Sequence, residues 1–196
     1  MTAYDNHTFD EEDLSGQTWS GDTFDDCTFL DCDLSELTTE AVVFTRCTFV
    51  GCRLADSEHR RTAFRTCTLD RCPMPGATFT DCSLLGSTIT QSLMRRVSLT
   101  DCDMSLTSLG GLTLHRVDLT GSRLREANLA STTVTSSTLA GVDLTGSRAV
   151  GATVTDSDLR GARIDPAFWV AAKVTDTVVD HDHAVDYALA HGLRLG

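Results

Sequence analysis

The residues most able to do chemistry in this chain are eight cysteines, several of which stand five residues apart beside aspartates. The stretch DDCTFLDCDL, residues 25–34, holds Cys27 and Cys32 among four aspartates. Thiolates beside carboxylates could bind a metal ion or form a redox pair. The choice between these roles and simple packing depends on whether the spacing runs through the whole chain. The other cysteines are Cys47, Cys52, Cys67, Cys72, Cys82 and Cys102.

A second candidate for metal binding lies near the C-terminus. The segment DHDHAVDYALAHGL, residues 180–193, carries three histidines and three aspartates. The same segment fits a capped helix, in which Asp182 accepts the first amide hydrogen bonds and Gly192 ends the helix. We expect the helix, with metal binding as the alternative. Its apolar residues would share one face: Val185, Ala188 and Leu189.

A period of five residues dominates the sequence. Steps of five from Phe9 to Val179 give 35 positions, of which only Thr39 and His59 are not apolar. A helix repeats every 3.6 residues and a strand every two, so neither element explains this period. The period instead predicts a coil of short straight sides, each of which sends one large side chain inward and then turns a corner. Four such sides would complete a turn of about 20 residues.

The cysteines all occupy one class in this period, two residues before the large residue. That class holds small residues almost throughout, as a narrow interior requires. Because a buried cysteine packs like a small hydrophobe, we expect interior thiols, with metal or redox roles as the alternative. Thr39 and His59 are 20 residues apart and should stack on neighbouring turns. We expect local hydrogen bonds to satisfy this polar pair rather than a functional site inside the core.

The repeat itself resembles the pentapeptide-repeat family, as in ANLAS at 127–131, VDLTG at 117–121 and SDLRG at 157–161. The resemblance implies an all-β protein, a right-handed quadrilateral β-helix with a short C-terminal α-helical cap. The repeat frame is long enough for about 8–9 coils of this kind. We expect two parts: the β-helix at 1–180, and a helical cap and dimerisation segment at 181–196.

Several segments sharpen this resemblance: SEHRRTAF at 57–64, LGGLTL at 109–114, IDPAFW at 164–169 and HGLRL at 191–195. With an uninterrupted repeat frame, they resemble the MfpA-type fluoroquinolone-resistance proteins more than the longer-looped Qnr type. The resemblance implies a homodimer joined through the C-terminus, giving an acidic rod that imitates B-DNA. Such a rod binds DNA gyrase, a type II topoisomerase, and inhibits it or protects it from poisons such as fluoroquinolones. The implied dimer interface comprises Phe168, Trp169, Val185, Tyr187, Leu189 and Leu193.

The charge of the chain is compatible with such a partner. The net charge is −12, and residues 1–40 carry twelve carboxylates and no lysine or arginine. This surface should repel nucleic acid and attract a basic protein surface. On a 20-residue turn, seven carboxylates should lie along one edge, interrupted by Arg96 and Arg116. We predict that these seven form the partner-binding acidic surface: Glu36, Asp56, Glu58, Asp118, Asp156, Asp158 and Asp176.

Motifs of other functional classes are absent from the sequence. It contains no P-loop, dinucleotide-binding glycine motif, H-E-x-x-H or G-x-S-x-G, so we expect no enzymatic activity, cofactor or metal. It contains no apolar run long enough to span a membrane and no signal-peptide pattern at its start, so we expect a cytoplasmic protein. Two alternative functions stay open. One is a self-immunity factor that acts on poison-bound gyrase without competing with DNA, and the other is a scaffold for an unrelated partner.

Overall fold

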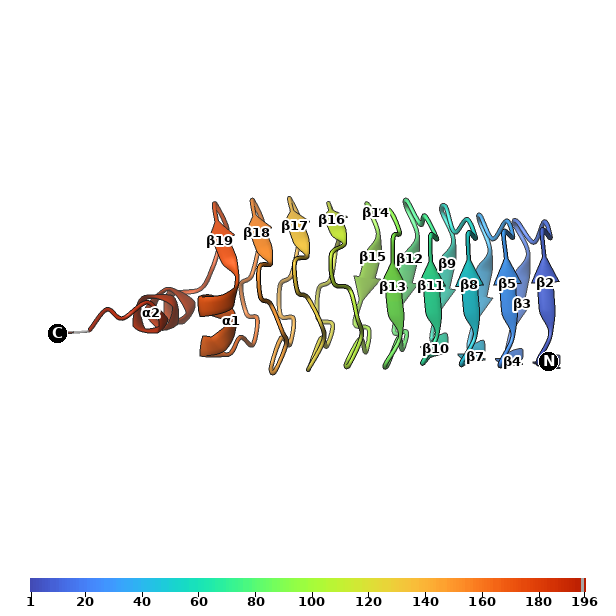
Figure 1. Cartoon of the computed structure of the whole chain (residues 1–196), viewed down its shortest axis with the longest axis horizontal. Coiled ribbons are helices and arrows are strands. Elements are labelled where there is room, and N and C mark those ends of the chain that lie inside the picture. Colours follow the sequence, from blue (N-terminus) through green and yellow to red (C-terminus); the bar gives the residue numbers. More distant parts are fainter. Residues whose placement is uncertain (195) are drawn as a thin grey trace.

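The computed structural model describes residues 1–194 and 196. These residues form a straight rod, a parallel β-solenoid of about nine turns, with the two termini at opposite ends (Figure 1). Every strand pair is parallel, and partners lie one turn apart, as Phe24 and Phe44 do in β4 and β7. The predicted fold class, a quadrilateral β-helix with a short C-terminal helix, is confirmed.

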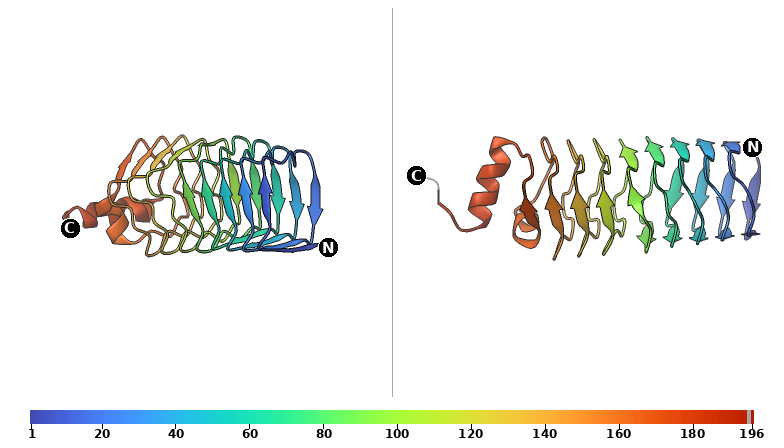
Figure 2. Two further views of the ribbon diagram at one scale, coloured as in Figure 1. Left: turned by 45° about the vertical axis from the view of Figure 1, so that its right-hand side comes forward. Right: turned by 90° about the horizontal axis from the view of Figure 1, so that it is seen from above.

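The strands form four sheets, one on each face of the rod (Figures 1 and 2). The first face contains β1 (Ala3–Asp5), β4 (Thr23–Asp25), β7 (Val43–Thr45) and β10 (Ala63–Arg65). The second contains β2 (Thr8–Asp10), β5 (Thr28–Leu30), β8 (Thr48–Val50), β11 (Thr68–Asp70) and β13 (Thr88–Thr90). The third contains β14 (Met94–Arg95), β16 (Thr113–His115), β17 (Thr133–Thr135), β18 (Thr153–Thr155) and β19 (Lys173–Thr175). The fourth contains β3 (Thr18–Ser20), β6 (Thr38–Glu40), β9 (Glu58–Arg60), β12 (Thr78–Thr80) and β15 (Ser98–Thr100).

The corners between faces are made by the residue two places after each large interior residue. These corner residues have positive φ, for example 55° at Asp56 and 75° at Gly76. The left-handed conformation turns the chain sharply, and glycine, asparagine and aspartate adopt it at the least cost. At Gly76 the close approach also matters, because a Cβ atom there would lie 2.2 Å from Oδ1 of Asp56 on the preceding turn.

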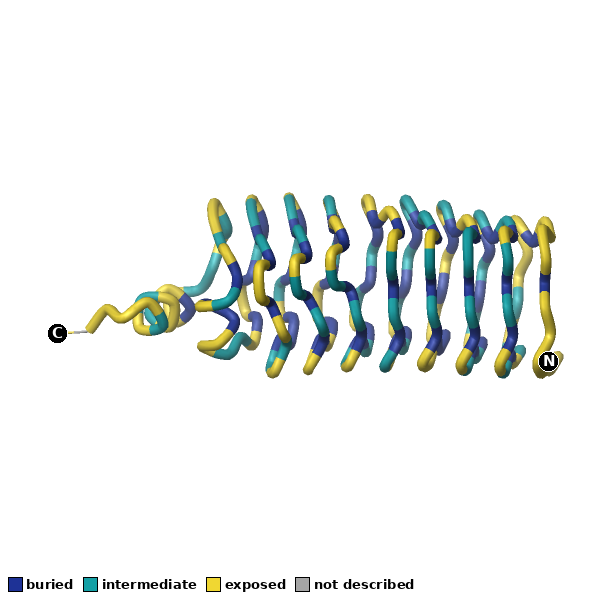
Figure 3. Tube along the Cα trace, viewed as in Figure 1, coloured by how far each residue is buried: buried dark blue, intermediate teal, exposed yellow. Residues whose placement is uncertain are grey.

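The interior is aromatic in the N-terminal half and aliphatic beyond it, and it is buried along the whole length of the rod (Figure 3). Phe44 stacks between Phe24 and Phe64 with ring centroids 4.8 Å from each. Phe29 stacks in the same way on Phe49, at 4.6 Å. One large side chain from each face and each turn therefore builds a continuous column along the axis.

All eight cysteines are free and buried, as their place in the period predicted. Burial raises the pKa of the Cys27 and Cys32 thiols, which keeps them protonated. They are more than small hydrophobes, however. The Cys52 thiol lies 3.3 Å from the carbonyl oxygen of Phe29 on the preceding turn, and Ser87 in an equivalent position donates to Phe64 at 2.7 Å. These thiols therefore bond neighbouring turns together, as the serine hydroxyls in the same class do.

Thr39 and His59 pair in register between β6 and β9, inside the core. The Thr39 hydroxyl lies 2.8 Å from Nδ1 of His59 and 2.8 Å from the Thr62 hydroxyl. Nε2 of His59 lies 3.1 Å from the Ser57 hydroxyl. The prediction of a polar pair satisfied by local hydrogen bonds is confirmed.

Two helices lie at the C-terminal end: α1 (Pro166–Ala171), which precedes β19, and α2 (His181–Ala190), which follows it. The predicted cap of the second helix was wrong, because the N-cap is Asp180 and Asp182 lies in the first helical turn. The side chain of Asp180 accepts a hydrogen bond from the amide of Gly161 on the preceding turn, and this fixes the residue where the helix begins. Gly192 ends the helix with φ of 85°, as predicted.

Candidate interaction surfaces

The seven predicted carboxylates, which we call the acidic ridge, lie on one edge of the rod, between the third and fourth faces. Glu36, Asp56, Asp156 and Asp176 are corner residues with φ between 48° and 57°. The other three lie two residues after this corner position, at the start of the fourth face. Glu58 pairs with Thr78, Asp118 bridges Thr138, and Thr138 in turn bridges Asp158.

The ridge carboxylates differ in how far other groups neutralise them. Asp118 accepts hydrogen bonds from the amide and hydroxyl of Thr120, at 2.9 and 2.6 Å, and both of these donors are neutral. Asp158 is held by Arg160, with Nη2 2.6 Å from Oδ2. The hydrogen bond from Arg160 is the main cause that lowers the pKa of Asp158 below its usual value. Asp158 is therefore paired with a cation, whereas Asp118 forms no ion pair with a residue that the structure describes.

A basic cluster divides the ridge into two acidic parts. The same corner column continues from Asp56 through Gly76 to Arg96 and Arg116, with amide hydrogen bonds of 3.0 Å at both arginines. Arg95 is exposed beside them on β14. None of the three arginines forms an ion pair with a residue that the structure describes. The ridge is thus acidic towards both ends of the rod, and in its middle Asp118 stands next to the three arginines.

Other acidic groups near the N-terminus are paired across turns. Arg46 holds both Asp25 and Asp26, with Nη2 2.7 Å from an oxygen of each. Arg53 pairs with Asp33 at 2.5 Å. Both arginines stand 20 residues after their aspartates, at Asp26 and Asp33, a spacing that the sequence displays and that sequence reasoning missed.

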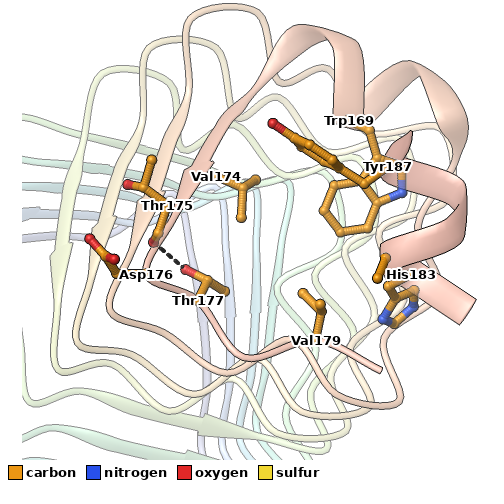
Figure 4. Close-up of a pocket in the computed structure, with 9 residues that line it drawn as sticks. Trp169, Val174, Thr175, Asp176, Thr177, Val179, His183 and Tyr187 are labelled. Atoms are coloured by element: carbon orange, nitrogen blue, oxygen red, sulfur yellow. Dashed lines mark hydrogen bonds between the residues drawn. The ribbon is translucent and has the colours of Figure 1, made fainter. Parts of the chain in front are cut away.

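The C-terminal end carries a cavity of about 220 Å³ between β19 and α2 (Figure 4). Trp169, Val174, Val179 and Tyr187 line its apolar side. Among the predicted dimer residues, Phe168 and Trp169 are buried within this chain, at 3% and 1% exposure. Val185 is half-buried, and the exposed members are Tyr187, Leu189 and Leu193.

The described residues contain one group of potential metal ligands, Asp5, Asp25 and Asp26, whose ligand atoms lie within 4.8 Å of one another. The guanidinium of Arg46 already bonds two of these carboxylates, which makes the group an ion-pair network. Across residues 1–194 and 196, no helix is both long and apolar enough to cross a membrane.

Comparison with known proteins agrees with the repeat frame. One family model, described as a pentapeptide repeat region, matches residues 42–114, and a second, described as pentapeptide repeats (8 copies), matches residues 127–164. A search of curated protein sequences returns no significant match.

Solved structures that are similar to this chain have low sequence identity to it. A trypsin-treated form of QnrB1, a plasmid-mediated fluoroquinolone resistance protein, is 17% identical with a TM-score of 0.56, covering 99% of this chain and 100% of its own. HetL, a pentapeptide repeat protein involved in heterocyst differentiation regulation in the cyanobacterium Nostoc, is 19% identical with a TM-score of 0.42, covering 90% of this chain and 87% of its own. Together with the matches to the two repeat models, the uninterrupted frame shows that this chain belongs to the pentapeptide-repeat family.

Proposed function

We propose that this chain is a cytoplasmic, non-enzymatic rod that binds DNA gyrase in place of a DNA duplex. Binding would inhibit the enzyme, protect it from poisons such as fluoroquinolones, or do both. The observation that carries the proposal is the acidic ridge, which presents carboxylates of separate turns along one edge of a rigid rod. The fold shared with a fluoroquinolone resistance protein supports it.

The charge density permits partial mimicry. Nine turns spaced by about 4.8 Å give a rod of about 43 Å, along which duplex DNA would carry about 25 charges. The chain has 28 carboxylates but a net charge of −12, because 16 lysines and arginines offset them. The resemblance to DNA is therefore local and follows the parts of the surface that lack arginine.

The basic cluster favours a second candidate function. Arg95, Arg96 and Arg116 would repel a DNA-binding groove that contacted the whole ridge. A rod that uses only one acidic part would leave the DNA site of gyrase partly free. It would then act as a self-immunity factor on poison-bound gyrase, without displacing DNA.

Two gyrase reactions distinguish these functions: supercoiling and poison-induced cleavage, each measured against increasing protein. Simple mimicry predicts that supercoiling and cleavage fall together. Self-immunity predicts that cleavage falls while supercoiling continues. If neither reaction changed, the gyrase proposal would be rejected.

Charge reversal on the ridge gives a sharper prediction. The double substitution Asp118→Lys and Asp158→Lys changes the local charge by four and should raise the protein concentration needed for the gyrase effect by roughly tenfold or more. Circular dichroism should stay unchanged, because both side chains point outward, and urea unfolding should show only a modest loss of stability from the lost hydrogen bonds with Thr120 and Arg160. Asp70→Lys with Asp103→Lys, the same charge change on other faces, is the matched control. If the control lost as much activity, net charge and not the ridge would be responsible.

We further propose a homodimer formed through residues 181–196, with residues 1–180 as the β-helix. The exposed side chains of Leu189 and Leu193, at 48% and 63%, would contact the partner, together with Tyr187 and Val185. Phe168 and Trp169 would support this surface from inside the chain. The double substitution Leu189→Lys and Leu193→Lys should convert the dimer into a monomer in analytical ultracentrifugation, whereas Leu106→Lys on the exposed middle should not. A wild-type protein that is monomeric at all concentrations would contradict the proposal.

A further inference from the structure

The two ends of the rod are built differently. At the C-terminal end, α1 lies within the last turn, before β19, and α2 follows β19 (Figures 1 and 2). At the N-terminal end, β1, β2 and β3 are the terminal strands of their sheets, and each pairs on one side only, with β4, β5 and β6. The free side of such a strand offers unpaired amide and carbonyl groups, which readily pair with another extended chain.

The direction of these free groups follows from the next turn. The amide of Thr28 donates to the carbonyl of His7 on the turn before it, at 2.9 Å. Thr8 is the equivalent residue one turn earlier, in register with Thr28. Its amide therefore points away from β5 and out of the end of the rod, with no partner among the described residues.

Aromatic side chains form the last layer of the core at this end. The ring of Tyr4 stacks on Phe24 at 5.0 Å, and that of Trp19 lies 5.1 Å from Phe24. Beside them the ring of His7 lies 4.5 Å from Phe9. A cavity of about 230 Å³ opens over this layer and is also lined by Glu12 and by Asp22, whose carboxylate already pairs with the N-terminal amine at 3.7 Å. Aromatic faces next to carboxylates are a favourable setting for the cationic group of lysine or arginine.

The carboxylates of the first turn lack internal cations. Five of them form no ion pair with any residue that the structure describes, in contrast to Asp25, Asp26 and Asp33 on the second turn. Four are consecutive and begin at the end of β2. The five are Asp5, Asp10, Glu11, Glu12 and Asp13.

We propose that the N-terminal end of the rod binds an extended cationic segment of another protein. The segment adds as a strand to the free edge of β2, and its lysine or arginine side chains reach the carboxylates at 10–13 and the aromatic layer. Strand addition supplies the backbone hydrogen bonds, and the alternate side chains supply specificity. The end of a second copy is disfavoured, because two such acidic ends repel each other, and nucleic acid is disfavoured for the same reason.

The test uses a synthetic eight-residue peptide that alternates arginine and valine. Titration of the full chain with this peptide should give saturable binding, a change in Trp19 fluorescence, and slowed hydrogen exchange at the amides of β2. Trp169 at the opposite end is 1% exposed and should not respond. The same peptide with alternate amides N-methylated, and one with glutamate in place of arginine, should both lose binding.

Two variants locate the site. Glu11→Gln with Glu12→Gln should weaken peptide binding by roughly five- to tenfold, as the loss of two exposed charge contacts would. Thr8→Pro should remove the outward amide while the rest of the rod stays folded. Asp81→Asn with Asp101→Asn makes the same charge change in the middle of the rod, outside the acidic ridge, and should leave binding unaltered.

Three results would overturn the proposal: no saturable binding, equal binding of the N-methylated peptide, or equal weakening by the mid-rod control. The assay contains no gyrase, so its outcome is independent of the proposed function.

Discussion

Acidification should destabilise the rod progressively as the pH falls from about 6.5 to about 3, because burial lowers the pKa of His59 to about 3. His59 is surrounded by neutral groups: the hydroxyls of Thr39 and Ser57 contact its ring nitrogens, and Phe79 stacks on the ring at 4.5 Å. Below the ordinary pKa of histidine, the unfolded chain binds a proton at His59, whereas the folded chain keeps this side chain neutral. The lost stability should reach about 3–5 kcal/mol by pH 3.

The substitution His59→Phe isolates this effect. Phenylalanine can keep the stacked contact with Phe79 and the edge-to-face contact with Phe64, while Thr39 keeps its hydrogen bond to Thr62. Urea unfolding followed between pH 7 and pH 4 should show a steep loss of stability in the wild type and a much smaller loss in the variant. Hydrogen bonds from arginine lower the pKa values of Asp26 and Asp158. The stability that depends on these two carboxylates is lost only below the ordinary pKa of aspartate, so it does not contribute to the change measured between pH 7 and pH 4. Equal slopes for both proteins would show that His59 does not control acid stability.

Removal of the central aromatic ring, by Phe44→Ala, should cost about 3–5 kcal/mol of unfolding free energy. Phe44 is 1% exposed and stacks on both Phe24 and Phe64, so both neighbours lose contacts at once. A solenoid cannot easily close such a void, because its turns are held at a fixed spacing by hydrogen bonds on every face. The expected measurement is a lower midpoint in urea with little change in slope.

Phe44→Leu should cost less than Phe44→Ala, since the same column already uses leucine at Leu84, Leu124 and Leu144. Leu106→Ala, at an exposed corner, should change the stability by less than about 0.5 kcal/mol. If Phe44→Ala were as mild as Leu106→Ala, the aromatic stack would not be the main source of stability in the N-terminal half.

The fold was predictable because each five-residue side repeats the same physical problem. A large residue must point inward, a small one must precede it, and a corner must follow, so the frame from Phe9 to Val179 specifies the coil without knowledge of distant contacts. The pairing of Thr39 with His59 followed from the same count. The frame also places Arg46 20 residues after Asp26, which is the spacing of an ion pair between neighbouring turns.

Other features depended on contacts with groups whose positions the five-residue period does not determine. The cap of α2 moved to Asp180 because the amide of Gly161, on the preceding turn, binds the aspartate side chain. The hydrogen bonds of the thiols, such as Cys52 to Phe29, depend on the exact direction of buried side chains. Burial of Trp169 reflects its contact with His183 and Tyr187 of α2, whose ring centroids lie 5.8 Å from its own, and a local pattern cannot specify this contact. The acidic ridge could be located by counting, but the clamp of Arg160 on Asp158 could not.

The parallel pairing of successive turns has a mechanical consequence. Because the hydrogen bonds between turns run along the rod axis on all four faces, bending the rod would lengthen the bonds of one face and compress those of the opposite face. Duplex DNA has no such bracing, and proteins bend a site of 20–30 base pairs for roughly 1–6 kcal/mol. An enzyme that requires a curved duplex for its reaction could hold this rod by its charges and yet fail to curve it. The stiffness of the β-helix would then halt the catalytic cycle after binding.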